Sequence, residues 1–159
     1  IECTVHGMPA GIGEPVFEKL DAALAKAVMS IGAVKGVEIG DGFQAATSHG
    51  SINNDAFTCE NGSISKLTNH SGGILGGMSD GSDIVLRAAF KPTPSISQVQ
   101  QTVTTTSENI NLSIHGRHDP IIVPRAVVVV ESMVALTLID LLFANMSSRL
   151  DKILSFYKR

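Results

Sequence analysis

Cysteine is scarce in this chain. The 159 residues contain two cysteines, Cys3 and Cys59, which lie far apart and form no Cys-X-X-Cys pair. A disulfide framework and a thiol-rich zinc site both need several closely spaced cysteines, so neither is indicated. A reducing cytoplasm is the expected location.

An excess of basic residues is also missing. The chain has 12 Lys and Arg against 15 Asp and Glu, which gives a formal net charge of -3 and a pI near 5.9. General binding to nucleic acid depends on clustered cations, and no basic stripe is visible. We therefore expect no nucleic acid among the partners.

No uninterrupted apolar run is long enough to cross a membrane. The longest apolar stretch, residues 126–144, contains Glu131 and Asp140. These charges interrupt it short of the roughly 20 apolar residues that a bilayer requires. A basic start followed by an apolar segment, typical of a signal peptide, is not seen either. We expect a buried helix here and no membrane association.

The chain does contain enough apolar sequence for the core of one globular domain, with 43% hydrophobic residues. Alternation in residues 1–6 predicts a half-buried strand. Residues 15–32 carry apolar side chains at helical spacing, beginning with Phe17. Pro15 suits the first turn of this helix, and Gly32 is expected to end it in the left-handed conformation.

Strands are predicted in residues 33–43 and 82–92, a polar loop or flap in 47–70, a hairpin in 101–116 and a long helix from about residue 125. The run Val127–Val130 alone would favour a strand, and the length of the apolar segment decides for a helix.

The first segment with possible chemistry is rich in glycine. Residues 68–83 read TNHSGGILGGMSDGSD, and such glycines could let backbone amides approach a ligand closely. The segment lacks the Gly-Lys-Ser/Thr ending of a phosphate-binding P-loop and does not match the dinucleotide fingerprint. A tight turn between two strands is the structural alternative.

The second segment, residues 90–97, reads FKPTPSIS. Lys91 leaves a strand just before two prolines that fix the backbone around Thr93 and Ser95. A lysine and two hydroxyl groups on a stiff loop could bind an anion. A strand end with a solvated lysine explains the same residues.

The third segment, residues 115–125, reads HGRHDPIIVPR. Arg117 offers planar donors for phosphate or carboxylate, and Asp119 offers a base or a hydrogen-bond acceptor. His115 and His118 could instead bind a metal, but the further ligands would have to come from a set at no recognised spacing, namely His49, His70 and Cys59. A surface network of ion pairs is the structural alternative.

Five blocks, in their order along the chain, closely resemble the chorismate synthase family. The blocks are MPAGIGEPVFEKLDA, MSIGAVKGVEIGDGF, NHSGGILGGMSDG, KPTPSIS and GRHDPIIVPRAVVVVESMVALTLIDLL. The resemblance runs over nearly the whole chain and weakens in residues 47–68, in residues 98–113 and after about residue 145. It includes all three segments described above.

The resemblance implies an α+β fold in which long central helices are sandwiched between antiparallel sheets, and a homotetramer as the assembled form. The implied enzyme is a carbon-oxygen lyase that acts on phosphate. It removes phosphate and a C6 hydrogen from 5-enolpyruvylshikimate 3-phosphate by anti 1,4-elimination and gives chorismate for aromatic amino-acid biosynthesis. Reduced FMN is required, and the sequence leaves open whether an outside reductase or a built-in NAD(P)H activity reduces it.

The resemblance also implies roles for particular residues. The cofactor-binding set is Gly32, Ala33, Gly76, Lys91, Pro92, Thr93, Pro94, Ser95 and Arg117. Arg117 would also bind substrate, and Asp119 would be catalytic, placed near the flavin N5 as a proton acceptor or hydrogen-bond partner. His118 and Arg125 would support the site, and no metal is expected.

Two departures from the family stand out. Gly32 occupies a position where bacterial members commonly have Asn, so a side-chain contact to the flavin is lost. The blocks typical of the family's amino-terminal half, with its catalytic histidines, are absent. Residues 1–159 are therefore expected to be the carboxy-terminal part of a chorismate synthase domain, inactive alone and prone to associate through exposed apolar surface. A non-catalytic flavin-binding or oligomerisation module is the alternative, and a metal-binding protein comes third.

Overall fold

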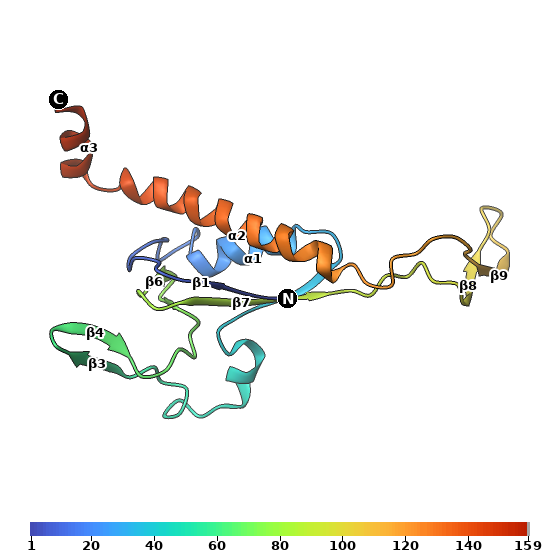
Figure 1. Ribbon diagram of the computed structural model, residues 1–159, viewed down its shortest axis with the longest axis horizontal. Coiled ribbons are helices and arrows are strands. Elements are labelled where there is room, and N and C mark those ends of the chain that lie inside the picture. The colour runs from blue at the N-terminus through green and yellow to red at the C-terminus, as the bar shows by residue number, and fades with distance from the viewer. Residues whose placement is uncertain (159) are drawn as a thin grey trace.

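The computed structural model describes residues 1–158 (Figure 1). Its strands are β1 (Glu2–Val5), β2 (Val34–Ile39), β3 (Phe57–Glu60), β4 (Ser63–Lys66), β5 (Ile74–Leu75), β6 (Met78–Ser79), β7 (Ile84–Phe90), β8 (Val99–Val103) and β9 (Asn109–Ser113). Its helices are α1 (Leu20–Met29), the 3-10 helix η1 (Gly42–Thr47), α2 (Val123–Met146) and α3 (Leu150–Tyr157). This mixture of helices and antiparallel strands confirms the predicted α+β class.

A three-stranded antiparallel sheet lies at the centre of the molecule, in the order β1-β7-β2. Strand β7 pairs on both sides, and, as in any β-strand, its successive side chains point to opposite faces of the sheet. Ile84, Leu86 and Ala88 are buried on the face that meets the helices, whereas Arg87 and Ala89 are exposed on the other face. The strands predicted at the start of the chain and near residues 33–43 and 82–92 are thus confirmed.

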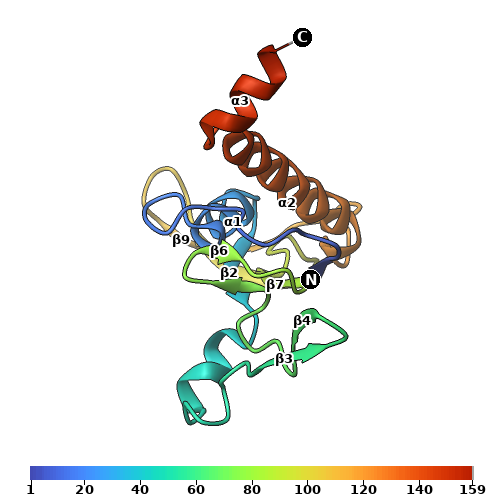
Figure 2. The same ribbon diagram turned by 90° about the vertical axis from the view of Figure 1, so that its left-hand side faces the viewer.

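Both longer helices cover the same face of this sheet (Figures 1 and 2). In α1 the buried side chains Leu20, Leu24 and Val28 recur every fourth residue and therefore lie on one side of the helix. The buried face of α2 consists of Ala126, Val130, Val134, Leu138 and Leu141, which follow one another at intervals of three or four residues. These two faces and the buried side of β7 make one hydrophobic core.

The helix expected over residues 15–32 forms, but it is shorter at both ends. Pro15 does not begin it, because the chain turns back between the Glu14 amide and the Glu18 carbonyl, and Phe17 has a φ of 60° and is 92% exposed. Gly32 does not end it either. The helix ends at Met29, and the residue with a positive φ is Ala33, at 70°.

The polar segment predicted as a loop contains a β-hairpin, so that prediction was wrong in part. Strands β3 and β4 pair through the Asn61-Gly62 turn, and both turn residues have a positive φ. Asn-Gly is the dipeptide that a tight two-residue hairpin favours, and it was present in the sequence. The hairpin lies on the side of the central sheet away from the helices (Figure 2).

The carboxy-terminal helix is confirmed, with a break before α3. Helix α2 is the one helix in residues 1–158 with the length and apolar composition of a membrane span. Helices in the core of a protein often have the same length and composition. Its outer face leaves large apolar side chains exposed, among them Val128 (60%), Leu136 (63%) and Phe143 (65%). The association expected from such a surface stays a prediction.

Candidate functional site

Two segments connect the body of the molecule to the predicted hairpin β8–β9, which projects away from it (Figure 1). We call residues 91–98 and 114–122 the stalk. Lys91 and Arg117, one on each segment, are exposed. The stalk therefore carries both cations and several hydroxyl groups, although a whole hairpin separates its two segments in the sequence.

A backbone hydrogen bond fixes the base of the stalk. The Lys91 amide donates to the Ala33 carbonyl at 2.7 Å, so the segment after α1 and the end of β7 meet at this point. Gly32, the preceding residue, is exposed, and nothing lies within 4 Å of the position that a Cβ would take there. Gly32, Ala33 and Lys91, three of the residues that the family resemblance implies for cofactor binding, therefore lie next to one another.

Side chains organise the second segment. His118 lies with its Nδ1 3.1 Å from the Ser95 hydroxyl and its Nε2 3.1 Å from the Ile114 carbonyl. The Asp119 carboxylate forms an ion pair with the Arg125 guanidinium. The two terminal nitrogens of Arg125 lie 2.8 Å and 3.4 Å from the two carboxylate oxygens of Asp119. Arg125 and Asp119 are 76% and 39% exposed, so this forked pair orients the carboxylate more than it stabilises the fold.

Thr93 carries an unsatisfied polar atom. Its hydroxyl oxygen is out of contact with solvent, yet it has no hydrogen-bond partner in residues 1–158. Buried hydroxyl groups are rarely left without a partner, because the lost hydration costs about 1–3 kcal/mol. The flanking Pro92 and Pro94 restrict the backbone of this segment. A ligand with a polar edge could supply the missing hydrogen bond.

The glycine-rich segment forms the hairpin β5–β6, which matches the tight turn considered from the sequence. Gly76 lies in that turn with a φ of 59° and with open space beside it. The Leu20 amide donates to the Gly77 carbonyl at 2.7 Å, so this turn lies against the first residue of α1. Gly32 and Ala33 follow the other end of the same helix. Gly76 is thus separated from the stalk by the length of α1.

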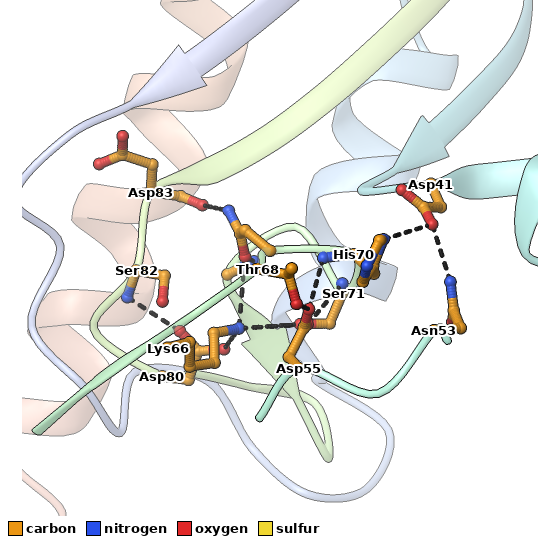
Figure 3. Close-up of polar contacts among 12 residues, drawn as sticks. Asp41, Asn53, Asp55, Lys66, Thr68, His70, Ser71, Asp80, Ser82 and Asp83 are labelled. Atoms are coloured by element: carbon orange, nitrogen blue, oxygen red, sulfur yellow. Dashed lines mark hydrogen bonds and ion pairs between the residues drawn. The ribbon is translucent and has the colours of Figure 1, made fainter. Parts of the chain in front are cut away.

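A buried ion network was not anticipated from the sequence (Figure 3). The Lys66 ammonium lies 2.7 Å from Asp80 and 3.4 Å from Asp55, and the three side chains are 3%, 7% and 4% exposed. Lys66 also donates to Asn69 and Ser71. The network joins the outer hairpin β3–β4 to both ends of the glycine-rich segment.

Hydrogen bonds decide the charge state of the two carboxylates. Burial by itself raises the pKa of Asp55, but hydrogen bonds from the Ser71 hydroxyl and amide and from the His70 amide outweigh it. The pKa of Asp55 therefore lies well below its ordinary value. For Asp80 the pKa is likewise lowered, against the effect of burial, chiefly by the hydrogen bond from Lys66. Both carboxylates are ionised at neutral pH.

The histidines and cysteines weighed as metal ligands do not gather. Within residues 1–158 no three His, Cys, Asp or Glu side chains are grouped in a way that could hold a metal ion. His70 instead binds Asp41 through Nδ1 at 2.8 Å, and Asn53 donates to the same carboxylate at 2.7 Å (Figure 3).

Comparison with known proteins gives one consistent result. The family model described as chorismate synthase matches residues 1–143, which include the stalk and the glycine-rich segment. The chain is 65% identical to the chorismate synthase of Lachnospira eligens over 159 residues, which are 100% of this chain and 43% of the relative. It is 62% identical to that of Methanosarcina acetivorans over 141 residues, 88% of this chain and 39% of the relative.

A solved structure agrees. The protein titled "Crystal Structure of Chorismate Synthase" superposes with a TM-score of 0.73 at 31% identity, and the match covers 97% of this chain and 40% of that one. The chain thus spans less than half the length of the curated relatives that it matches. A family match over 143 of 159 residues and a shared fold lead to one conclusion: the chain belongs to the chorismate synthase family.

Proposed function

We propose that this chain forms the carboxy-terminal part of a cytoplasmic chorismate synthase and that its stalk forms one side of the active site. The enzyme would convert 5-enolpyruvylshikimate 3-phosphate to chorismate. One observation carries the proposal: residues 1–143 match the family, and they include the stalk, whose two segments carry Lys91, Thr93, Ser95, Arg117 and Asp119 and are linked by the Ser95–His118 hydrogen bond.

The cations have a clear physical purpose in this reaction. The departing phosphate and the substrate carboxylates carry several negative charges, which need fixed positive groups around them. Arg117 can bind two oxygens of one anion through its fork, and Lys91 supplies a compact point charge. Both are exposed on the stalk, where they can meet a ligand.

The residues present also fit reduced FMN. When bound, the flavin would supply the electron that is lent to the substrate and then recovered. The Thr93 hydroxyl lacks a partner in residues 1–158 and could bind a polar edge of the flavin. Asp119 would hold or accept a proton near the flavin N5, and the Arg125 fork would hold its carboxylate in one orientation.

The isolated chain is expected to be inactive, because it spans 43% of the length of the Lachnospira eligens relative. The remaining part would have to provide the other side of the site. A homotetramer is the proposed assembly. The exposed apolar face of α2 is consistent with burial against further protein.

A chimera tests the proposed function directly. This chain replaces its counterpart in the Lachnospira eligens chorismate synthase, and chorismate formation is measured without oxygen, with reduced FMN and 5-enolpyruvylshikimate 3-phosphate. We expect turnover within about tenfold of the unmodified relative. A folded chimera that binds reduced FMN but forms no chorismate would favour the non-catalytic flavin-binding module instead.

Asp119→Asn in the chimera tests the catalytic role. The amide keeps the shape of the side chain but cannot accept the proton, so turnover should fall by about 10²–10⁴-fold while FMN binding is retained. Glu108→Gln, an exposed carboxylate in the turn of the β8–β9 hairpin, serves as the control. Unchanged turnover in Asp119→Asn would refute the assignment.

A further inference from the structure

The two segments of the stalk have little to hold them together. In residues 1–158 no backbone hydrogen bond joins 91–98 to 114–122, and regular pairing begins only in the β8–β9 hairpin beyond them. The contact between Ser95 and His118 is the one side-chain hydrogen bond that connects the two segments within that part of the chain, and the next cross-link, from the Ser113 hydroxyl to the Ser97 carbonyl at 3.3 Å, lies at the edge of the hairpin. The Ser95–His118 contact therefore contributes to the relative position of the two segments.

The chemistry of the two imidazole contacts determines the tautomer of His118. A backbone carbonyl can only accept a hydrogen bond, so the Nε2 that faces Ile114 must carry the hydrogen. In the neutral ring, Nδ1 is then an acceptor and the Ser95 hydroxyl donates to it. In the charged ring, Nδ1 carries a hydrogen and donates to Ser95. The bridge exists in either state, which suits a structural link.

We propose that His118 is a positioning residue that holds the Thr93–Ser95 segment and the Arg117–Asp119 segment in register, so that both face one flavin. This inference rests on the proposed function. His118 lies between Arg117 and Asp119 in sequence, and its partner Ser95 lies two residues from Thr93. One side chain thus ties together four residues of the proposed site.

The bridge would strengthen flavin binding by preorganisation. Two loosely connected segments would lose conformational freedom when a ligand orders them, and that loss opposes binding. The Ser95–His118 bridge restricts them in advance. Its removal should weaken flavin binding about 2- to 10-fold, the range of one ordinary hydrogen bond.

The test uses the Lachnospira eligens chimera and anaerobic titration with reduced FMN. His118→Phe keeps a ring but loses both hydrogen bonds, and Ser95→Ala loses the partner hydroxyl. Each should weaken binding by the factor above. The double variant should bind no more weakly than the weaker single variant, because both changes break one link. His49→Phe, an exposed histidine outside the stalk, is the matched control and should bind as the parent does.

Two conservative substitutions of His118 distinguish the roles of its two ring nitrogens. The end of an Asn side chain lies near the position of Nδ1, so His118→Asn should keep most of the bridge to Ser95. Gln reaches the position of Nε2 instead, and His118→Gln should behave like His118→Phe. Equal binding in these two variants, or additive losses in the double variant, would overturn the positioning role while the proposed function stands.

A readout without flavin separates the two proposals. In the ¹⁵N spectrum of the 159-residue chain at pH 8, the Nδ1 resonance of His118 should shift in Ser95→Ala, because its hydrogen-bond donor is gone. An unchanged resonance would overturn the bridge. A parent chimera that does not bind reduced FMN would overturn the proposed function, and with it the role of the bridge in that site.

Discussion

The Lys66 ammonium lies 2.7 Å from the Asp80 carboxylate, and the two side chains are 3% and 7% exposed. This buried ion pair links the β3–β4 hairpin to the glycine-rich segment. Removal of Lys66 would leave the carboxylates of Asp55 and Asp80 buried without a compensating charge. The network in Figure 3 therefore makes the outer hairpin depend on a single lysine.

Lys66→Met should destabilise the protein by about 3–5 kcal/mol, because Asp55 and Asp80 would be left buried without their cation. Urea unfolding of the variant and the parent at pH 7 measures the difference. Lys35→Met, at an exposed position on β2, is the matched control and should change stability by less than about 0.5 kcal/mol. Equal midpoints for Lys66→Met and the parent would contradict the role of the network.

Acid should weaken the same network. The pKa values of Asp55 and Asp80 are lowered in the folded state, so the folded chain holds fewer protons there than the unfolded chain. Their contribution to stability is full above about pH 5 and is lost as the pH falls below the ordinary Asp value of about 4. Unfolding followed from pH 7 to pH 3 should show this loss. Asp55→Asn with Asp80→Asn should flatten the curve, and an equally steep curve in that variant would contradict the assignment.

Thr93→Val should affect stability and binding in opposite directions. The variant keeps the shape of the side chain and removes a buried hydroxyl oxygen that has no partner in residues 1–158. The free energy of unfolding of the isolated chain should stay the same or rise by about 1 kcal/mol. In the chimera, the same change should weaken binding of reduced FMN. Ser97→Ala, at an exposed position on the same segment, serves as the comparison. A loss of stability without any loss of binding would show that Thr93 has only a structural role.

Gly32→Asn should restore a contact that the family resemblance implies. The residue is exposed, and no heavy atom lies within 4 Å of its expected Cβ, so an asparagine fits without rearrangement. The added amide could form one hydrogen bond to the flavin, worth about 0.5–1.5 kcal/mol. Gly32→Ala, which adds the Cβ alone, is the control. Identical FMN affinity for both variants would argue against a flavin beside residue 32.

The sequence predicted what depends on local pattern. Apolar residues at helical spacing within 15–32 predicted α1, whose buried face is Leu20, Leu24 and Val28, because burial on one side of a helix imposes a period. The apolar segment 82–92, which ends at Pro92, predicted β7. The five ordered blocks predicted the family, which residues 1–143 confirm.

Contacts between distant segments escaped prediction. Lys66 lies 14 residues from Asp80 and His118 lies 23 from Ser95, and no periodicity relates side chains across such loops. The start of α1 was misplaced for a similar reason. Its first amide bonds to Gly77, so a tertiary contact, and not Pro15, determines where the helix begins.

The central claim is that the stalk forms one side of a flavin site. Hydrogen exchange of the chimera, measured with and without reduced FMN in the absence of oxygen, tests it most directly. Amides in residues 91–98 and 114–122 should exchange more slowly when flavin is bound, while those of the β3–β4 hairpin should not change. If the chimera binds FMN and the stalk amides exchange at the same rate, the flavin lies elsewhere and the account is wrong.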